Sequence, residues 1–383
     1  MGAGRGSLAK QGVTGAVAGA ARPHTESAPI GGVFELDLVE VLEARDAEWR
    51  FREAQSVTSG RTAVAILADA TRGRWLLPAY LCESVLQPLR RARVPFDFYP
   101  VGGDLRPHLD ELERAVETEA PAAVLVIDYF GFPPAPEDAG RLRALRDSCL
   151  VVEDCVQGSL VELPDPAGGR IGDAVFTSFR KYLPVPDGGL LTGVANRSLP
   201  PASASMGKRL LGQLLRGAWV AGEVEGPDVE ATFLGLLGAG EAALDEELPL
   251  ESTSRLSQRL LARLDLAAAA TQRRANFAAL VGALEGSEAV VPLVHELPTG
   301  VSPLVLPVRV GAGRRDALRA ALVRRHVFCP LHWPLPGEID PARFPEEHSL
   351  ASEMLGLPVD QRYEPADMER LARELADAWQ ELT

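Results

Sequence analysis

Apolar and polar positions along the first half of the chain switch repeatedly between a strand pattern and a helix pattern. Residues 122–127 (AAVLVI) form a continuous apolar run, which is typical of a strand buried on both faces. Residues 109–119 instead repeat apolar positions at helical spacing. By the same patterns we expect further strands at 74–77, 95–99, 149–152, 174–178 and 189–192, and further helices at 61–70, 83–93 and 137–147. This order predicts an α/β fold with a mostly parallel sheet and helices on both of its faces.

The pattern changes in the last third of the chain. Residues 256–284 are typical of one long helix, and the charged positions on it are expected to face solvent: Arg259, Arg263, Asp265, Arg273 and Arg274. The elements expected after it are a strand at 304–310, a helix at 314–325, a strand at 327–330 and a closing helix at 365–382. We therefore predict a disordered leader at 1–27, a large domain at 28–240 and a small α+β domain at 241–383.

Composition narrows the class of protein. The net charge of −14 argues against a nucleic-acid partner, which an acidic protein repels. No run of about 18 apolar residues is present, so no membrane span is expected. The four cysteines, none of which form a C-x-x-C pair, predict no metal site, no disulfide framework and a cytoplasmic location: Cys82, Cys149, Cys155 and Cys329.

Lysine is rare in this sequence. The chain has 39 lysines and arginines, and lysine occurs only at positions 10, 181 and 208. Lysine can form an imine and can lose its proton near neutral pH, whereas arginine does neither. In such a chain, a lysine inside a well-formed segment therefore indicates a role in imine formation or proton transfer.

Asp154 is the first candidate site residue, because it follows the apolar run that begins at Cys149. In open α/β sheets, ligands bind beyond the carboxyl ends of the strands. A buried aspartate at that edge needs a partner, and a protonated pyridine nitrogen is one. The alternatives are a helix N-cap and a metal ligand.

Lys181 is the second candidate. It lies between Ser178, at the end of an expected strand, and a turn rich in proline and glycine, in a tight segment that we expect to be non-helical. In a partly buried pocket, desolvation and neighbouring cations would lower the pKa of this lysine and make it nucleophilic. The alternative is an exposed lysine on a loop.

The third candidate is the turn at residues 59–62 (SGRT), which opens a helix. Free backbone N–H groups and the helix dipole make such a turn an anion cradle. The hydroxyl of Thr62 and the guanidinium of Arg61 could add contacts. The alternative is an ordinary N-cap at Ser59.

Taken together, these segments resemble the DegT/DnrJ/EryC1/StrS aminotransferases, a branch of the fold type I pyridoxal-phosphate (PLP) enzymes. The resemblance extends from about residue 28 to the end of the chain. It is carried by residues 59–63 (SGRTA), 77–80 (LPAY), 153–157 (EDCVQ) and 178–189 (SFRKYLPVPDGG), and by the late segments 328–334 and 357–358.

The resemblance implies a fold, a cofactor and a set of roles. It implies the aspartate-aminotransferase-like fold, PLP as cofactor and a homodimer. Lys181 would be the Schiff-base lysine, Asp154 would lie at the pyridine nitrogen, and Gln157 would lie near the ring hydroxyl. The other cofactor-binding residues would be Gly60, Arg61, Thr62 and Ser178 on the phosphate and Tyr80 at the ring.

The chain also departs from the family pattern. Cys82 stands where the family commonly has a ring-stacking aromatic residue, and two residues are missing before Lys181 relative to the commoner spacing. Asp128, at the end of the 122–127 strand, could contact substrate or serve the structure alone. For His332 a structural role in the small domain is favoured.

The favoured function is amino transfer from an amino-acid donor to a small keto acceptor, a keto-sugar nucleotide or a natural-product precursor. Lys181 would move the proton between the donor and the cofactor. One alternative is elimination, decarboxylation or cyclisation of an amino acid on the same cofactor. The other is a regulator with this fold and no catalysis. Residues 251–258 could contact a partner subunit.

Overall fold

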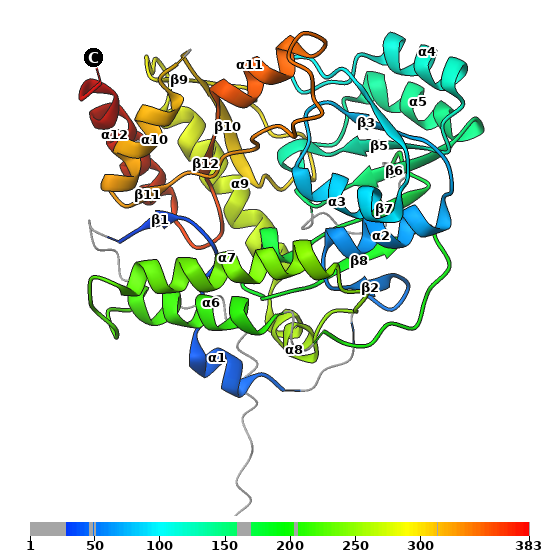
Figure 1. Ribbon diagram of the computed structural model, residues 1–383. Helices are drawn as coiled ribbons and strands as arrows, with labels where there is room; N and C mark the ends of the chain where they lie inside the picture. Colours follow the sequence, from blue (N-terminus) through cyan, green and yellow to red (C-terminus); the bar gives the residue numbers. More distant parts are fainter. Residues whose placement is uncertain are drawn as a thin grey trace, which may run out of the picture.

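The computed structural model describes residues 28–45, 49, 51–158, 170–202, 206–311 and 313–382. The leader predicted at residues 1–27 lies outside this range. Figure 1 shows a large sheet with its helices on one side of the molecule, and on the other side a smaller group of strands and helices that includes the C-terminus.

A seven-stranded sheet forms the larger part. Its order is β2-β8-β7-β6-β5-β3-β4, in which β8 is antiparallel to both neighbours and the pairs from β7 to β4 are parallel. The mostly parallel α/β fold predicted from the sequence is therefore confirmed. The strands are β2 (Gln55–Val57), β3 (Trp75–Pro78), β4 (Phe96–Tyr99), β5 (Ala123–Ile127), β6 (Leu150–Asp154), β7 (Ala174–Phe176) and β8 (Gly189–Thr192).

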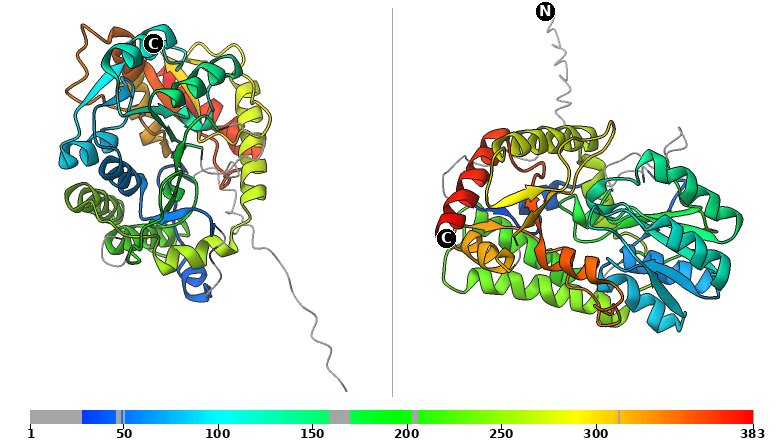
Figure 2. Two further views of the ribbon diagram at one scale, coloured as in Figure 1. Left: turned by 90° about the vertical axis from the view of Figure 1, so that its right-hand side faces the viewer. Right: turned by 90° about the horizontal axis from the view of Figure 1, so that it is seen from above.

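Helices cover this sheet, and α2 and α3 lie side by side on it (Figures 1 and 2). All five residues of β5 are buried, as its continuous apolar run predicts. The α-helices of this part are α2 (Gly60–Ala70), α3 (Glu83–Ala92), α4 (Leu109–Glu119) and α5 (Pro136–Ala144). Three 3-10 turns accompany them: η1 (Tyr129–Gly131), η2 (Leu145–Asp147) and η3 (Phe179–Lys181).

The smaller part has its own hydrophobic core, built on the antiparallel sheet β12-β10-β9. Strand β1, near the start of the described chain, also belongs here, since it pairs in parallel with β11. The strands are β1 (Ile30–Gly31), β9 (Val290–Pro292), β10 (Val305–Val310), β11 (Val327–Phe328) and β12 (Met354–Pro358). The helices are α9 (Leu266–Ala283), α10 (Arg315–Arg324), α11 (Pro345–Glu353) and α12 (Pro365–Gln380).

A helical hairpin that the pattern did not predict links the two parts. It consists of α6 (Gly207–Val220) and α7 (Val229–Glu247), which pack along each other (Figure 1). Alpha-helix α7 has apolar and small residues on every side, so it has no helical periodicity to detect. Residue 240 lies inside α7, and the predicted domain limits at 28–240 and 241–383 stay a prediction.

The single helix expected at 256–284 is wrong. The chain forms α8 (Arg255–Arg263) and then α9, because Leu264 is extended and the Asp265 side chain caps α9 by accepting the Ala268 N–H at 2.9 Å. The expectation that Arg273 faces solvent is also wrong, because this arginine is fully buried.

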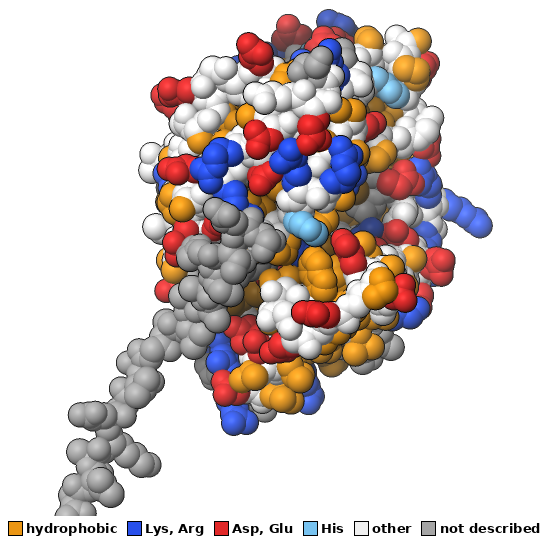
Figure 3. All heavy atoms as spheres, turned by 90° about the vertical axis from the view of Figure 1, so that its left-hand side faces the viewer, with side chains coloured by type: hydrophobic (Ala, Val, Ile, Leu, Met, Phe, Trp, Pro, Cys, Tyr) orange, Lys and Arg blue, Asp and Glu red, His pale blue; other side chains and the backbone are white. Residues whose placement is uncertain are grey.

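The surface mixes charges of both signs. On the face in Figure 3, acidic and basic side chains are interspersed. Arg325, just after α10, pairs with Glu374 at 2.8 Å and Glu381 at 2.6 Å on the C-terminal segment. Short helix α1 (Leu38–Glu43) instead exposes Leu38, Val39 and Leu42. Within the described ranges, no helix is both long and apolar enough to cross a membrane.

Candidate active site

The predicted site residues converge at the carboxyl edge of the large sheet. Strands β5, β6 and β7 are parallel and in register, with Ile127 opposite Asp154 and Asp154 opposite Phe176. Strand β7 ends at Phe176, two residues earlier than expected, so Ser178 lies just beyond it. This edge is where open α/β sheets bind ligands.

Asp154 ends β6 and is buried. Its Oδ1 accepts the Val156 N–H at 2.8 Å. Burial raises the pKa of Asp154 to about 7, although the Val156 N–H and the nearby Lys181 lower it. No arginine pairs with this carboxyl group among the described residues, so the side chain has charge to offer a cationic ligand.

Lys181 ends the 3-10 turn η3, so the expectation of a non-helical segment is wrong at this point. Its side chain is solvent-exposed, while Arg180 and Tyr182 on either side are buried. Dense surrounding protein nevertheless lowers the pKa of Lys181; Cys82 and Glu241 raise it, and Arg180 lowers it further. An amine that solvent reaches and that loses its proton readily is suited to nucleophilic chemistry.

The turn at residues 59–62 opens α2, as predicted. The Ser59 side chain caps the helix by accepting the Thr62 N–H at 3.4 Å, and the Thr62 hydroxyl donates to Pro249 C=O at 3.0 Å. Both the N–H and the hydroxyl of Thr62 therefore bond within the protein. The first N–H groups of a helix have no acceptor inside that helix, and in α2 these are the N–H groups of Gly60 and Arg61. A Cβ on Gly60 would lie 3.0 Å from Val156, which places this turn next to the Asp154 strand end.

An aromatic cluster forms one wall near Lys181. The Tyr80 ring lies 5.6 Å from Tyr129 and 5.5 Å from Trp333, and the buried Tyr80 hydroxyl has no hydrogen-bond partner in the described chain. His332 packs edge-on against Trp333. Burial, together with the charge of Lys181, lowers the pKa of His332 to about 3, which keeps the imidazole neutral. His332 thus lies near the reactive lysine, although the sequence favoured a purely structural role.

Gln157 lies behind Asp154 and is buried. Its side-chain oxygen accepts the Phe130 N–H at 2.8 Å, and its backbone carbonyl accepts the Tyr182 hydroxyl. These bonds fix the loop after β6 against the residue that follows Lys181. The predicted role of Gln157 at the ring hydroxyl stays a prediction.

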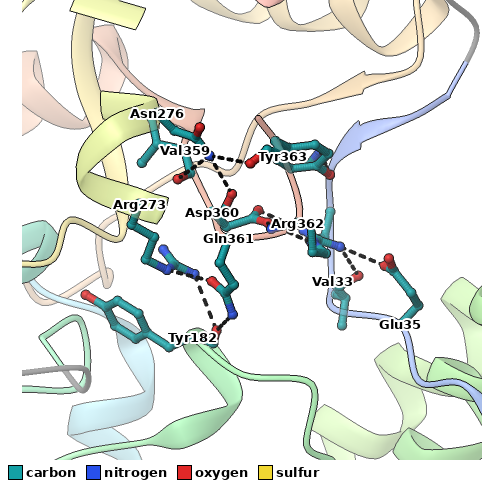
Figure 4. Close-up of polar contacts among 12 residues, drawn as sticks. Val33, Glu35, Tyr182, Arg273, Asn276, Val359, Asp360, Gln361, Arg362 and Tyr363 are labelled. Carbon is teal, nitrogen blue, oxygen red and sulfur yellow. Dashed lines mark hydrogen bonds and ion pairs between the residues drawn. The ribbon is translucent and has the colours of Figure 1, made fainter. Parts of the chain in front are cut away.

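Tyr182 ties the lysine turn to the smaller part of the molecule (Figure 4). Its carbonyl accepts Gln361 Nε2 at 2.7 Å and an Arg273 guanidinium nitrogen at 3.4 Å. The Arg273 guanidinium also lies 4.5 Å from the centre of the Tyr182 ring. Sequence reasoning missed this tie, because Arg273 is one of many arginines on a charged-looking helix. The one feature of the sequence that could have pointed to this contact is that Tyr182 directly follows Lys181.

Asp128 belongs to a separate buried ion-pair cluster. Arg170 lies 2.9 Å from Asp128 and 3.2 Å from Glu153, and donates to Cys155 Sγ at 2.9 Å. The ligand atoms of the three acceptors lie within 4.8 Å of one another, close enough to hold a metal ion, but the Arg170 cation lies among them. Burial raises the pKa of Asp128 to about 8, with a further contribution from Glu153.

Residues 251–258 contact their own chain. The Thr253 N–H donates to Ser56 Oγ at 3.0 Å on β2, and the Ser254 N–H donates to Asp187 at 2.8 Å. This segment therefore helps to position β2 and the turn before β8. Its predicted contact with a partner subunit stays a prediction.

This combination of sheet, strand-end aspartate and lysine turn is the fold type I PLP-dependent transferase fold. By sequence, the chain matches no protein-family model and no curated protein. Solved structures match its fold over most of their length. The aminotransferase TlmJ from Streptoalloteichus hindustanus shares 18% identity over 86% of this chain and 87% of its own, with a TM-score of 0.61.

Two further structures show the same architecture. The Streptococcus pneumoniae protein Spr1654, in its PMP form, shares 15% identity over 92% of this chain and 98% of its own, with a TM-score of 0.65. A DegT DnrJ EryC1 StrS aminotransferase from Brucella abortus shares 17% identity over 85% of each chain, with a TM-score of 0.58. At these identities the comparisons establish the fold and leave activity to the site.

Proposed function

We propose that the protein is a PLP-dependent aminotransferase. The observation that carries the proposal is the arrangement of charged groups around Lys181. Asp154 is a buried carboxyl group near Lys181, and no basic side chain among the described residues forms an ion pair with it. Arg61, at the start of α2, belongs to a group of basic side chains whose charge also acts on Lys181. PLP carries a cationic ring nitrogen at one end and an anionic phosphate at the other, so its charges complement both.

The residues present fit this cofactor. Asp154 would hold the proton on the ring nitrogen, and a cation there would itself lower the pKa of this carboxyl group. The first N–H groups of α2 and Ser178 would face the phosphate. Lys181, whose pKa is lowered, would hold the cofactor through its amine and later accept and return the proton of the donor α-carbon. Bound PLP supplies the electron sink that makes this proton transfer feasible.

The fold comparisons support amino transfer over other PLP chemistry. The solved structures of this fold named above include aminotransferases, and Spr1654 is in a PMP form. A structure described as DesI with its TDP-sugar product shares 18% identity and a TM-score of 0.63. We therefore include an amino-acid donor and a keto acceptor of sugar-nucleotide or natural-product type in the proposal. A homodimer and a cytoplasmic location complete it, resting on the family resemblance and on the absence of a disulfide among the described cysteines.

The test is a half-reaction with the purified full-length chain. Mixed with PLP, it should become yellow, and adding a donor amino acid should convert the cofactor to pyridoxamine phosphate. Lys181→Ala should lose the yellow band and lower amino transfer roughly 10²- to 10⁴-fold, since it removes the group that moves the proton. Lys208→Ala, at an exposed lysine, is the matched control.

Two results would contradict the proposal. Turnover of a donor with no pyridoxamine phosphate formed would point to elimination, decarboxylation or cyclisation instead. A full-length chain that stays colourless with PLP would exclude the cofactor and favour a non-catalytic regulator.

A further inference from the structure

Turn η3, which ends at Lys181, is held in place through the residue that follows it. Tyr182 caps the C-terminal end of this turn and is fully buried. Its carbonyl accepts Gln361 Nε2 at 2.7 Å, from the smaller part of the molecule (Figure 4). Its phenol donates to the carbonyl of Gln157, in the loop after β6. The residue next to the reactive lysine is therefore held from two sides.

The Lys181 amine has no hydrogen bond of its own that would set its position. Charges act on it, those of Cys82 and Glu241 foremost, but within the described part of the chain no donor or acceptor bonds to it. The four-carbon stem of a lysine is flexible. Where this amine lies therefore depends on the turn that carries it, and a bond that fixes the turn also acts on the amine.

The side-chain amide of Gln361 can face the lysine turn in one orientation only. Its oxygen accepts the Arg273 Nε–H at 2.7 Å, and a guanidinium group can only donate. The amide nitrogen must therefore face Tyr182, whose carbonyl can only accept. Arg273 reaches the same carbonyl at 3.4 Å, which is a longer and weaker bond. Gln361 thus supplies the principal donor to the Tyr182 carbonyl.

The segment that carries Gln361 is itself fixed by other contacts. Asn276 on α9 donates to the carbonyl of Asp360 at 3.0 Å and to that of Tyr363 at 2.9 Å, on either side of Gln361. The Tyr363 hydroxyl also accepts a backbone N–H of β1 at 2.7 Å. Because its own backbone is held in this way, Gln361 presents its donor from a rigid support.

We infer that Gln361 is a positioning residue for Lys181, which fixes the end of turn η3 by donating to the Tyr182 carbonyl. The inference deepens the proposed function and rests on it, because it concerns the lysine that would hold the cofactor. Gln361 follows the last segment that carries the family resemblance, at 357–358. Lys181 thus takes its position from both parts of the molecule, through the phenol and the carbonyl of one tyrosine.

Gln361→Glu separates this role from the stability of the fold. The new carboxylate keeps the bond from Arg273, which becomes charge-assisted, but it has no N–H for the Tyr182 carbonyl and repels it. We therefore expect the variant to fold and the end of the turn to be released. Gln361→Leu removes the same donor without adding a charge. Gln272→Glu is the matched control, because Gln272 Nε2 donates at 3.0 Å to the Tyr363 carbonyl, away from the lysine turn.

The probe is trace acetic anhydride on the full-length chain without PLP, with the acetylation of each lysine read by mass spectrometry. The chain has only three lysines, so the exposed Lys208 serves as an internal reference. In the wild type, the pH profile of Lys181 acetylation should have its midpoint below 10.5, because dense surroundings lower the pKa of this amine. Releasing the turn moves the amine out of these surroundings. In Gln361→Glu and Gln361→Leu, the midpoint should rise by roughly half a pH unit, and acetylation at pH 7.5 should fall roughly three-fold relative to Lys208.

The outcomes separate the inference from the proposed function. Urea unfolding first establishes that each variant is folded. An unchanged Lys181 profile in folded Gln361→Glu or Gln361→Leu would overturn the inference. An equal change in Gln272→Glu would also overturn it, since the effect would then come from a general weakening of the small core. Failure of the proposed function shows differently, as a wild type that stays colourless with PLP while the Lys181 profile still changes in both Gln361 variants.

Discussion

Two groups of arginines lie near the lysine turn, and they differ in how fully the hydrogen-bond donors of their guanidinium groups are used. On the small-domain side, every guanidinium nitrogen of Arg273 and Arg362 has a partner (Figure 4). Arg362 pairs with Asp360 and Glu35 at 2.8 Å and 2.7 Å. We call the group of Arg61, Arg180, Arg209 and Glu241 the arginine cluster. In it, Arg180 and Arg209 share the Glu241 carboxylate, and their buried Nε–H groups have no hydrogen-bond partner among the described residues.

Two aspartates show the same contrast. Burial raises the pKa of Asp360, but Arg362 and Arg273 together lower it below the ordinary value. Asp154 is also buried, and burial raises its pKa to about 7, since no described arginine pairs with it. Groups such as Asp360 and Arg362, whose hydrogen bonds and charges are paired within the chain, serve its structure. The buried Asp154 carboxyl group and the unpaired Nε–H donors of the described arginine cluster instead indicate a ligand.

The largest effect is expected from removing an arginine whose guanidinium nitrogens all have hydrogen-bond partners. Arg273→Ala should lower the free energy of unfolding by about 3–5 kcal/mol, because it leaves the carbonyls of Pro303 and Leu304 without their buried donor. Urea unfolding of the full-length chain measures this. A loss below about 1 kcal/mol would mean that Arg273 contributes no more to stability than the arginine cluster does, which would contradict the difference proposed between the two groups.

The next effect concerns pH and the two aspartates. In the folded, cofactor-free chain Asp154 keeps its proton up to about pH 7, whereas its ordinary pKa is 3.8. It therefore stabilises the folded state at low pH, and that stabilisation is lost as pH rises through 7. Between pH 7.5 and pH 5, the wild type should gain about 2 kcal/mol relative to Asp154→Asn.

Asp360→Asn is the matched control for this pH effect. Because the pKa of Asp360 is lowered, the group is ionised in both states over the same pH range, and the difference from wild type should stay constant. Urea unfolding at the two pH values tests both variants. Equal pH dependence in Asp154→Asn and Asp360→Asn would show that the two carboxyl groups are not in different states.

The smallest effect is expected from removing an arginine of the arginine cluster. In the cofactor-free chain, Arg209→Gln should change the free energy of unfolding by less than about 1 kcal/mol, because the lost ion pair with Glu241 is offset by relief of repulsion from Arg180. The same urea measurement applies. A loss as large as that of Arg273→Ala would mean that the arginine cluster is a structural network.

Local patterns predicted the large sheet and much of its helical cover. The helix at 109–119 has the expected limits, because its apolar face repeats at helical spacing and Leu109, Leu112 and Val116 are buried. Patterns could not predict α7, whose apolar and small residues are spread around the helix, or the end of a helix at Leu264. The sequence brought Lys181 and Asp154 together through their motifs, but whether an arginine has a partner depends on tertiary contacts. Arg273 and Arg209 are therefore indistinguishable in the sequence.

The pairing of β1 with β11 has a consequence for how the chain folds. The Ile30 N–H donates to His326 C=O at 2.9 Å, and the Gly31 N–H donates to the Tyr363 hydroxyl at 2.7 Å, across a separation of 332 residues. During synthesis these early residues cannot form their contacts until the segment that contains Tyr363 has been made. Contacts of such separation slow folding, because a long loop must close first. We therefore expect the small core to be completed late in folding, when the first and last described segments pair.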